Sequence, residues 1–269
     1  MILELAIVYL VICAAACVFQ RRLIYYPTKL TTEAANDEAV ARGFSAWRNP
    51  SGTIIGWQMR ASPETRGSVL VVHGNAGCAL DRDYLAEPIR DGSHLNVFVL
   101  EFPGYGVRTG SPSMKSLLAA GTEAFDLLKT NGPVFVVSES IGAGTAAYLA
   151  KTNPGQLAGL VMFAPFDNLV SVANNQMPFL FPGLFLWDRY DPEGWLSQYR
   201  GPVKVILAGS DEVIPPKFGR RLFDSLQGPK ELQQVPRAGH NDVAEQSPEW
   251  WKETVALLRQ PKDGAVRSQ

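Results

Sequence analysis

The sequence is poor in cysteine, histidine and net charge, and each scarcity excludes a class of protein. Three cysteines among 269 residues cannot form a disulfide framework. Three scattered histidines make no ligand cluster, so we expect neither a metal nor an organic cofactor. The net charge is −1 and no basic cluster interleaves with aromatic residues, which argues against nucleic acid as a partner.

What remains is the composition of a globular protein, with 46% hydrophobic and 19% charged residues. A chain of 269 residues suits one large α/β domain. The 24 glycines and 19 prolines indicate many turns, as short strands alternating with helices require. We find neither an internal repeat nor a second domain.

The N-terminal segment, residues 1–22, differs from the rest of the chain. "MILELAIVYLVICAAACVFQRR" holds fifteen uncharged residues from Leu5 to Phe19, followed by Arg21 and Arg22. With the first three residues included, and with Glu4 reaching to the interface, the length suits a bilayer span. We therefore expect a single-pass membrane anchor.

Two other interpretations of this segment stay open. Residues 14–16 could serve as the small-residue site of a cleaved signal peptide, and the run ending at Cys17 resembles a weak lipoprotein box. Both would need a basic region before the apolar run, which this sequence lacks. If the anchor is retained, Arg21 and Arg22 favour a cytoplasmic position for the rest of the chain.

Downstream, hydrophobic runs alternate with helical patterns. We predict strands at 53–59, 68–74, 96–102, 133–138, 159–165, 203–209 and 231–236. We predict helices at 80–91, 116–129, 141–151 and 215–226, and a last one that begins at Ser247. Residues 23–30 suit the membrane interface or a first strand, and 31–50 are polar and typical of a loop. This alternation predicts an α/β fold with a mostly parallel sheet and helices on both faces.

Chemistry-bearing residues cluster where four of the strands end. The four stretches are "HGNAG" (73–77), "SESIG" (138–142), "GSDE" (209–212) and "AGHND" (238–242). Because right-handed crossovers bring the ends of parallel strands to one edge, we expect these loops to meet. Nucleophilic acyl transfer needs a serine, a base, an orienting carboxylate and N–H donors for an oxyanion, and these loops contain them.

The chain has three histidines from which the general base can be chosen. His94 precedes a strand and belongs to the opposite edge, and His73 is expected to brace its own loop by a hydrogen bond. His240 lies in a Gly-His turn that can project its ring. The order Ser140, Asp211, His240 is the one that α/β-hydrolases use.

The orienting carboxylate has competitors close in sequence. Glu212 is adjacent, and Asp188 and Asp191 lie in the preceding segment. Asp211 alone among them follows directly on a strand, which favours it.

Backbone N–H groups of Ile141 and Asn75 are the expected oxyanion donors. Ile141 begins the helix after the serine, where the helix N-terminus adds to the pull of its amide. Gly74 and Gly77 let the loop that carries Asn75 approach the reacting centre.

With these loops the chain resembles an α/β-hydrolase, specifically the membrane-tethered hydrolases described as serine-aminopeptidase-like. The matching stretches are "RRLIYYPT" (21–28), "VVHGNAG" (71–77), "EFPGYGVRTGSPS" (101–113), "SESIGAG" (138–144), "WDRYD" (187–191), "GSDEVIP" (209–215) and "GHND" (239–242). The resemblance implies Ser140 as nucleophile, Asp211 as acid and His240 as base. It also implies a turn beside the active site at 104–106, where we expect Tyr105 to contact the substrate.

The sequence departs from the family pattern at four positions. Ser138 stands where the nucleophile turn usually has its first glycine, and because serine is small and can hydrogen-bond locally, the change is mild. Pro103, Arg108 and Cys78 stand where many relatives have arginine, serine and asparagine.

The resemblance implies an α/β-hydrolase fold over 23–260 with a small cap insertion at 166–200, followed by a flexible tail at 261–269. Within the cap, "MPFLFPGLFLWDRY" (177–190) could line an acyl or aromatic pocket, touch the membrane, or pack on the core. We expect a small-molecule or lipid-like acyl substrate.

The expected activity is that of a serine hydrolase acting on a carboxylic ester, or on a thioester or amide. A peptidase of the serine aminopeptidase type is an alternative, but nothing in the sequence resembles an anionic pocket for a peptide's amino group. A second alternative is a non-catalytic, membrane-tethered binding module with the same fold.

Overall fold

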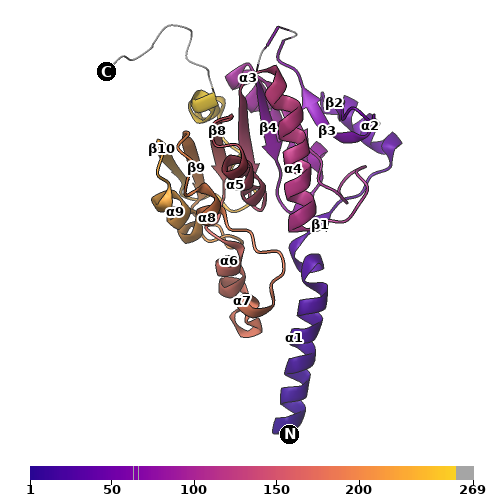
Figure 1. Cartoon of the computed structure of the whole chain (residues 1–269), viewed down its shortest axis with the longest axis vertical. Helices are drawn as coiled ribbons and strands as arrows, with labels where there is room; N and C mark the ends of the chain where they lie inside the picture. Colours follow the sequence, from indigo (N-terminus) through magenta and orange to yellow (C-terminus); the bar gives the residue numbers. More distant parts are fainter. Residues whose placement is uncertain (63, 66, 259–269) are drawn as a thin grey trace.

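An eight-stranded sheet forms the centre of the part of the chain that this computed structural model describes, residues 1–62, 64–65 and 67–258 (Figure 1). Its strands are β2 (Ser45–Arg48), β3 (Ile54–Met59), β4 (Ser68–Val72), β6 (Asn96–Leu100), β7 (Val134–Glu139), β8 (Leu157–Phe163), β9 (Val203–Ala208) and β10 (Lys230–Val235). They lie in the order β10-β9-β8-β7-β4-β6-β3-β2. From β6 to β10 the neighbours run parallel, whereas β3 is antiparallel to both β6 and β2.

The helices lie on both faces of this sheet and at its ends. They are α1 (Ile2–Ile24), α2 (Thr32–Ala41), α3 (Asp83–Ser93), α4 (Met114–Leu128), α5 (Gly142–Thr152), α6 (Leu169–Gln176), α7 (Pro182–Phe185), α8 (Pro192–Leu196), α9 (Pro216–Ser225) and α10 (Pro248–Thr254). Short 3-10 turns add η1 (Ala79–Arg82), η2 (Lys129–Asn131), η3 (Pro178–Leu180) and η4 (Val255–Leu258). A small parallel pair joins β1 (Tyr26–Pro27) to β5 (Ala76–Gly77).

Two apolar clusters hold the layers together, one on each face. Leu70 and Val72 of β4 face the cluster covered by α4, α5 and α9, and Val69 and Val71 face the one covered by α2, α3 and α10. Successive strand side chains point to opposite faces, so a strand covered on both sides must be apolar throughout. Each such buried side chain contributes about 1.5–3 kcal/mol to folding.

The seven predicted strands are all found, each with its ends within two residues of the prediction. Serine side chains cap two of the helices. Ser113 accepts a hydrogen bond from the Ser116 amide at the start of α4, and Ser247 accepts one from the Trp250 amide at the start of α10. The predicted tail at 261–269 lies outside the described residues.

The expectation of a polar loop over 31–50 is wrong. This stretch forms helix α2 and the edge strand β2. Helix α2 buries just two small side chains, Ala35 and Ala39, so it has no stripe of large apolar residues to reveal it in the sequence. Strand β2 has four residues and buries one large side chain, Trp47, which is too short a pattern to recognise.

Helix α1 projects from the body and runs beside α6 and α7 (Figure 1). It is long and apolar enough to cross a membrane, with a mean hydropathy of 2.7 over its best window. None of that window is buried inside the protein. Helices α6, α7 and α8, with η3, all lie in the segment between β8 and β9, residues 166–200, which we call the cap segment.

Candidate active site

Ser140 lies at the sharp turn between β7 and α5, at the carboxyl edge of the central strands. Its φ of 53° is a left-handed conformation that costs a residue with a side chain about 1–2 kcal/mol. The turn is held because the Ser140 amide donates to the Phe163 carbonyl at 2.9 Å and its carbonyl accepts from the Ala143 amide at 2.9 Å. Strain of this kind exposes the Oγ at the top of the sheet.

Two glycines after Ser140 are fixed by close packing. A Cβ at Gly142 would lie 2.2 Å from the Val72 carbonyl oxygen, and one at Gly144 would lie 2.2 Å from the ring of Tyr190. The position before the turn is different. Ser138 is buried, and its hydroxyl has no hydrogen-bond partner among the residues that the structure describes. The second half of the motif therefore carries the steric requirement, and the first half accommodates the serine side chain.

His240 and Asp211 extend a hydrogen-bonded line from Ser140. His240 Nε2 lies 3.0 Å from Ser140 Oγ, and His240 Nδ1 lies 2.7 Å from Asp211 Oδ2. A carboxylate oxygen accepts, so Nδ1 carries the proton and Nε2 is free to accept one from the serine. The three loops that bring these residues follow β7, β9 and β10.

The carboxylate of Asp211 is itself held in place. Its Oδ1 accepts hydrogen bonds from the amides of Val213 at 2.9 Å and Ile214 at 2.7 Å, which leaves Oδ2 for His240. Two of the competing acids are engaged elsewhere. Asp188 pairs with Arg21, and Asp191 caps α8. The geometry thus distinguishes Asp211 from its sequence neighbours.

Asn75 and Ile141 lie beside Ser140 in the lining of one cavity. The loop carrying Asn75 is tied down at three points. The Asn75 carbonyl accepts from the Tyr26 amide at 2.9 Å and from the Tyr105 hydroxyl at 2.8 Å, and its side chain donates to the Ile24 carbonyl at 3.1 Å. These contacts fix the position of the Asn75 backbone beside Ser140.

Tyr105 does not occupy the position expected for a substrate contact. Its side chain is fully buried and is not part of the cavity lining. The hydroxyl reaches the back of Asn75 instead, so the structure gives Tyr105 a supporting position. Burial raises its pKa, so the hydroxyl stays protonated as a donor.

Sequence reasoning missed Glu139, which immediately precedes Ser140. Its carboxylate accepts hydrogen bonds from the Gly74 amide at 3.2 Å, from Arg82 Nε at 2.8 Å and from the Tyr84 hydroxyl. Arg82 in turn donates to the Ala76 carbonyl at 2.7 Å. This carboxylate therefore joins the nucleophile turn to the loop that carries Asn75. The signal in the sequence is a charged residue at the end of a mostly apolar strand, directly before Ser140.

His73 braces its loop, as the sequence predicted. Its Nδ1 donates to the Gly74 carbonyl at 2.7 Å, and complete burial lowers its pKa to about 3, which keeps the ring neutral. Its Nε2 lies 3.8 Å from Glu101 Oε1, and burial raises the pKa of that carboxyl to about 7. Among the described residues no group of three or more His, Cys, Asp or Glu side chains could hold a metal ion.

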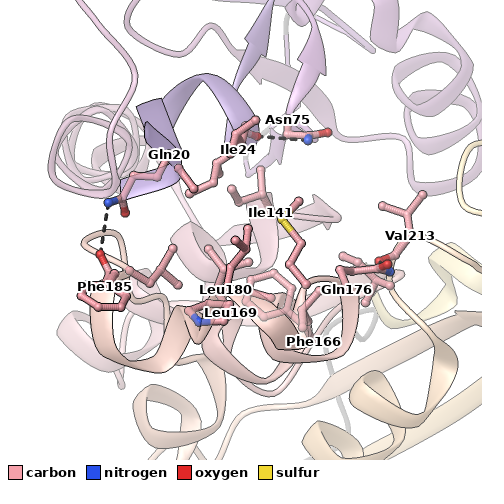
Figure 2. Close-up of a pocket in the computed structure, with 18 of the residues that line it drawn as sticks. Gln20, Ile24, Asn75, Ile141, Phe166, Leu169, Gln176, Leu180, Phe185 and Val213 are labelled. Carbon is pink, nitrogen blue, oxygen red and sulfur yellow. Dashed lines mark hydrogen bonds between the residues drawn. The ribbon is translucent and has the colours of Figure 1, made fainter. Parts of the chain in front are cut away.

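The cavity that reaches Ser140 is mostly apolar and has a volume of about 220 Å³ (Figure 2). One part of its wall comes from α1 and the opposite part from the cap segment, including Phe166, Leu169, Leu180 and Phe185. Three polar residues besides the serine line it: Gln20, Asn75 and Gln176.

We compared the sequence and the structure with those of known proteins. No family model matches the chain. An uncharacterised protein of Mycobacterium tuberculosis is 33% identical over 233 residues, which cover 83% of this chain and 81% of that protein. Protein bem46 of Schizosaccharomyces pombe is 29% identical over 195 residues, covering 68% of this chain and 64% of that protein. Human α/β-hydrolase domain-containing protein 17B is 28% identical over 193 residues, covering 69% and 64%.

Solved structures give the same result for the fold. An esterase of Pyrococcus furiosus has a TM-score of 0.65 at 15% identity, and the match covers 87% of this chain and 97% of that one. A monoacylglycerol lipase of Paleococcus ferrophilus has a TM-score of 0.57 at 18% identity, covering 76% and 98%. With its relatives, its parallel sheet and the serine turn after β7, the chain belongs to the α/β-hydrolase superfamily, among the α/β-hydrolase domain-containing proteins.

Proposed function

We propose that this protein is a serine hydrolase that cleaves a carboxylic ester by way of an acyl-enzyme. The observation that carries the proposal is the unbroken line of hydrogen bonds from Ser140 through His240 to Asp211, with spacings of 3.0 Å and 2.7 Å. Nucleophile, base and orienting acid need this contact geometry, and a family fold alone does not provide it.

In the first half of the cycle, Ser140 Oγ attacks the ester carbonyl carbon while its proton passes to His240 Nε2. The carbonyl oxygen becomes an oxyanion and accepts hydrogen bonds from the backbone amides of Asn75 and Ile141. Asp211 stabilises the imidazolium that forms. Collapse of the tetrahedral intermediate breaks the bond to the alcohol oxygen, which takes the proton from Nε2 and leaves.

In the second half, water replaces the alcohol. His240 takes a proton from the water as its oxygen attacks the acyl carbon, and the same amides hold the second oxyanion. The bond to Ser140 Oγ then breaks, Oγ recovers its proton from Nε2, and the carboxylic acid is released.

The cavity favours an ester or a thioester over the free amino end of a peptide. An aminopeptidase needs an anionic group to bind the substrate's ammonium, and no aspartate or glutamate is among the described residues that line this cavity. An apolar wall suits an uncharged acyl group instead.

We also propose that helix α1 anchors the protein in a membrane. Helix α1 has large apolar side chains exposed along its length, such as Leu5, Leu10 and Val18, and a bilayer is the environment that would cover them. The flanking Arg21 and Arg22 favour a cytoplasmic hydrolase domain, which we place at 23–260 with its cap at 166–200.

The test combines turnover with labelling of the nucleophile. The full chain in detergent micelles should hydrolyse p-nitrophenyl butanoate, and a fluorophosphonate should attach covalently to Ser140. The Ser140→Ala variant should show neither reaction while keeping the thermal melting temperature of the wild type. A folded protein that takes no fluorophosphonate at Ser140 would instead be a binding module with this fold.

A further inference from the structure

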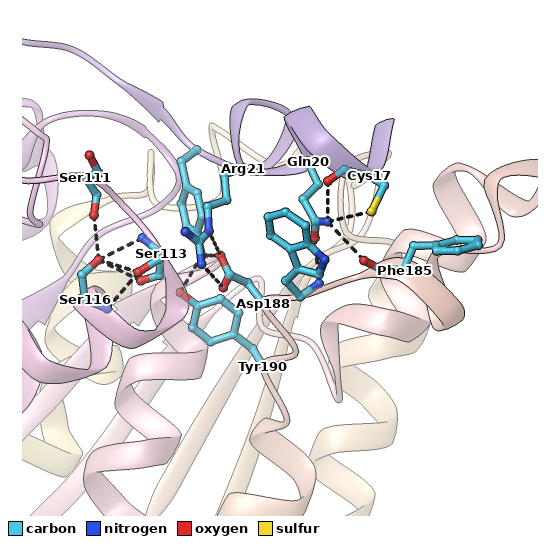
Figure 3. A network of polar contacts seen from close by, with 11 residues as sticks. Cys17, Gln20, Arg21, Ser111, Ser113, Ser116, Phe185, Asp188 and Tyr190 are labelled. Atoms are coloured by element: carbon cyan, nitrogen blue, oxygen red, sulfur yellow. Dashed lines mark hydrogen bonds and ion pairs between the residues drawn. The ribbon is translucent and has the colours of Figure 1, made fainter. Parts of the chain in front are cut away.

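Helix α1 is fastened to the cap segment by a set of polar contacts at its C-terminal end (Figure 3). Gln20 is buried: its amide nitrogen donates to the Phe185 carbonyl at 3.1 Å, and its amide oxygen accepts from the Trp187 amide at 2.7 Å. Arg21 pairs with the buried Asp188 at 3.2 Å. A flexible tether would make no such contacts, so α1 has a defined position relative to the catalytic residues.

That position makes α1 part of the site. Cys13, Ala16, Cys17 and Gln20 recur at helical spacing on one face of α1, and all four line the cavity that also contains Ser140. Ile24, at the end of the same helix, accepts the Asn75 side chain, so α1 also contacts the loop that carries an expected oxyanion donor. The helix thus reaches from the reacting centre along the cavity wall.

The cavity runs along α1 in the direction of the membrane. From Gln20 to Cys13 the helix advances about 10 Å, at 1.5 Å per residue. The cap follows it further, because the Tyr9 hydroxyl donates to the Phe179 carbonyl at 2.5 Å. If α1 spans the bilayer, η3 and α7 lie at the depth of the acyl chains.

The surface of the cap fits that depth. Phe179, Phe181, Leu184 and Trp187 are each more than half exposed. These side chains form an apolar patch beside the apolar helix α1. Exposing such a patch to water is unfavourable, whereas lipid acyl chains would cover it. If α1 spans the bilayer, the part of the cavity between α1 and the cap adjoins lipid.

We propose that α1 is one wall of the acyl-binding site, and that the substrate is a bilayer-resident, uncharged fatty acyl ester whose chain enters between α1 and α6–α7. This proposal rests on the proposed function, since it needs Ser140 as the nucleophile. The described residues lining the cavity include no charged side chain, so a charged headgroup would be unpaired inside it and must stay outside. The acyl chain points away from Ser140, along Cys17 and Cys13.

A photoreactive probe tests this placement. The full chain in phosphatidylcholine nanodiscs is treated with a long-chain alkyl fluorophosphonate that carries a diazirine near the end of its chain, and is then irradiated. We expect the phosphonate on Ser140 and cross-links to residues 13–20 of α1 and 169–186 of the cap. Phosphonate on Ser140 with cross-links elsewhere would overturn this inference and leave the proposed function standing. Absence of phosphonate from Ser140 would overturn both.

A matched pair of variants tests the wall by function. Cys13→Trp fills the far part of the cavity, whereas Val11→Trp places the same side chain on the same helix at a residue outside the cavity lining. We expect the ratio of hexadecanoyl to butanoyl ester turnover to fall about tenfold in Cys13→Trp, because an overfilled pocket excludes the longer chain first. Val11→Trp should keep the wild-type ratio. Equal ratios in the two variants would overturn the assignment of α1 as a wall.

Discussion

The two sides of the cavity are built in different ways. On one side, loops at the strand ends carry Ser140, Asp211 and His240, and each is held by hydrogen bonds to its neighbours. On the other side, α1 and the cap offer apolar side chains with large exposed areas, and polar contacts of Gln20 and Arg21 join the helix to the cap. In the function that we propose, the sheet edge fixes the chemistry, and the surface of α1 and the cap determines which substrate fits.

This contrast teaches where a change in sequence should matter. A substitution on the polar side removes an interaction that the transition state needs, so its cost appears in kcat. A substitution on the apolar side changes which acyl chain fits, or how firmly α1 and the cap stay together.

The base on the polar side should carry the largest effect. Replacement His240→Ala should lower kcat for p-nitrophenyl butanoate by about 10⁴-fold or more, since loss of a triad member removes general base and general acid together. The matched control is His94→Asn, at the left-handed C-terminal residue of α3, where asparagine is tolerated. Near-normal turnover by His240→Ala would mean that another group is the base.

Beneath the polar side, Glu101 should make stability depend on pH. Burial raises its folded pKa to about 7 from an ordinary 4.5, so its stabilising contribution is complete below pH 4.5 and is lost as pH rises through 7. At about 1.4 kcal/mol per pKa unit the loss is about 3 kcal/mol. The isosteric Glu101→Gln variant lacks this titration.

Chemical denaturation of both proteins in detergent from pH 5 to pH 8 measures the effect. The variant should gain on the wild type by up to about 3 kcal/mol over that range. His73, whose pKa is lowered to about 3, also makes the free energy of unfolding fall at acid pH. Because His73 is present in both proteins, its effect cancels in the difference between them. A constant difference between the two proteins across the range would contradict the raised pKa of Glu101.

Glu139 should affect turnover by positioning the loop that carries Asn75. In Glu139→Gln the contacts to Gly74 and Arg82 lose a negative acceptor, so the loop that carries Asn75 is held less firmly. We expect kcat to fall about 10–100-fold with KM little changed, as a misplaced oxyanion donor would cause. The control is Glu38→Gln in the surface pair with Arg42. A rise in KM at constant kcat would contradict a positioning role.

On the apolar side, the pair of Arg21 with Asp188 should have a small effect on stability. Arg21 is 48% exposed, so solvent screens the pair and about 1 kcal/mol is the expected contribution. Arg21→Ala should lower the melting temperature by about 2–4 °C. The exposed control Arg237→Ala should leave it unchanged, and an equal shift in both variants would remove any special role for the contact between α1 and the cap.

The polar side could be inferred from the sequence because its signals are local. Each strand is a short apolar run, and Ser140, Asp211 and His240 each follow one, so topology brings them to the same edge. Glu139 was missed because a glutamate at a strand end shows nothing of its partners Arg82 and Gly74, which are distant in the chain. The sequence indicates that Tyr105 lies close to the loop that carries Asn75. It does not indicate that the Tyr105 hydroxyl contacts the Asn75 carbonyl and not the cavity, because that depends on tertiary packing.

The apolar side could not be predicted in the same way. Gln20 and Phe185 are separated by 165 positions, and no periodic pattern links a helix of this kind to a short irregular cap. Helix α2 was missed for a related reason, because its buried face consists of the small Ala35 and Ala39. In both places the contacts that fix the structure are tertiary, and tertiary contacts override local pattern.

The central claim is that Ser140 forms a covalent acyl intermediate during turnover. The direct measurement is mass spectrometry of the full chain after rapid acid quench with p-nitrophenyl butanoate, followed by peptide mapping. We expect a butanoyl group on the peptide that contains Ser140 and none on the same peptide of Ser140→Ala. Steady turnover with no acyl group on Ser140, or with the group on another residue, would contradict it.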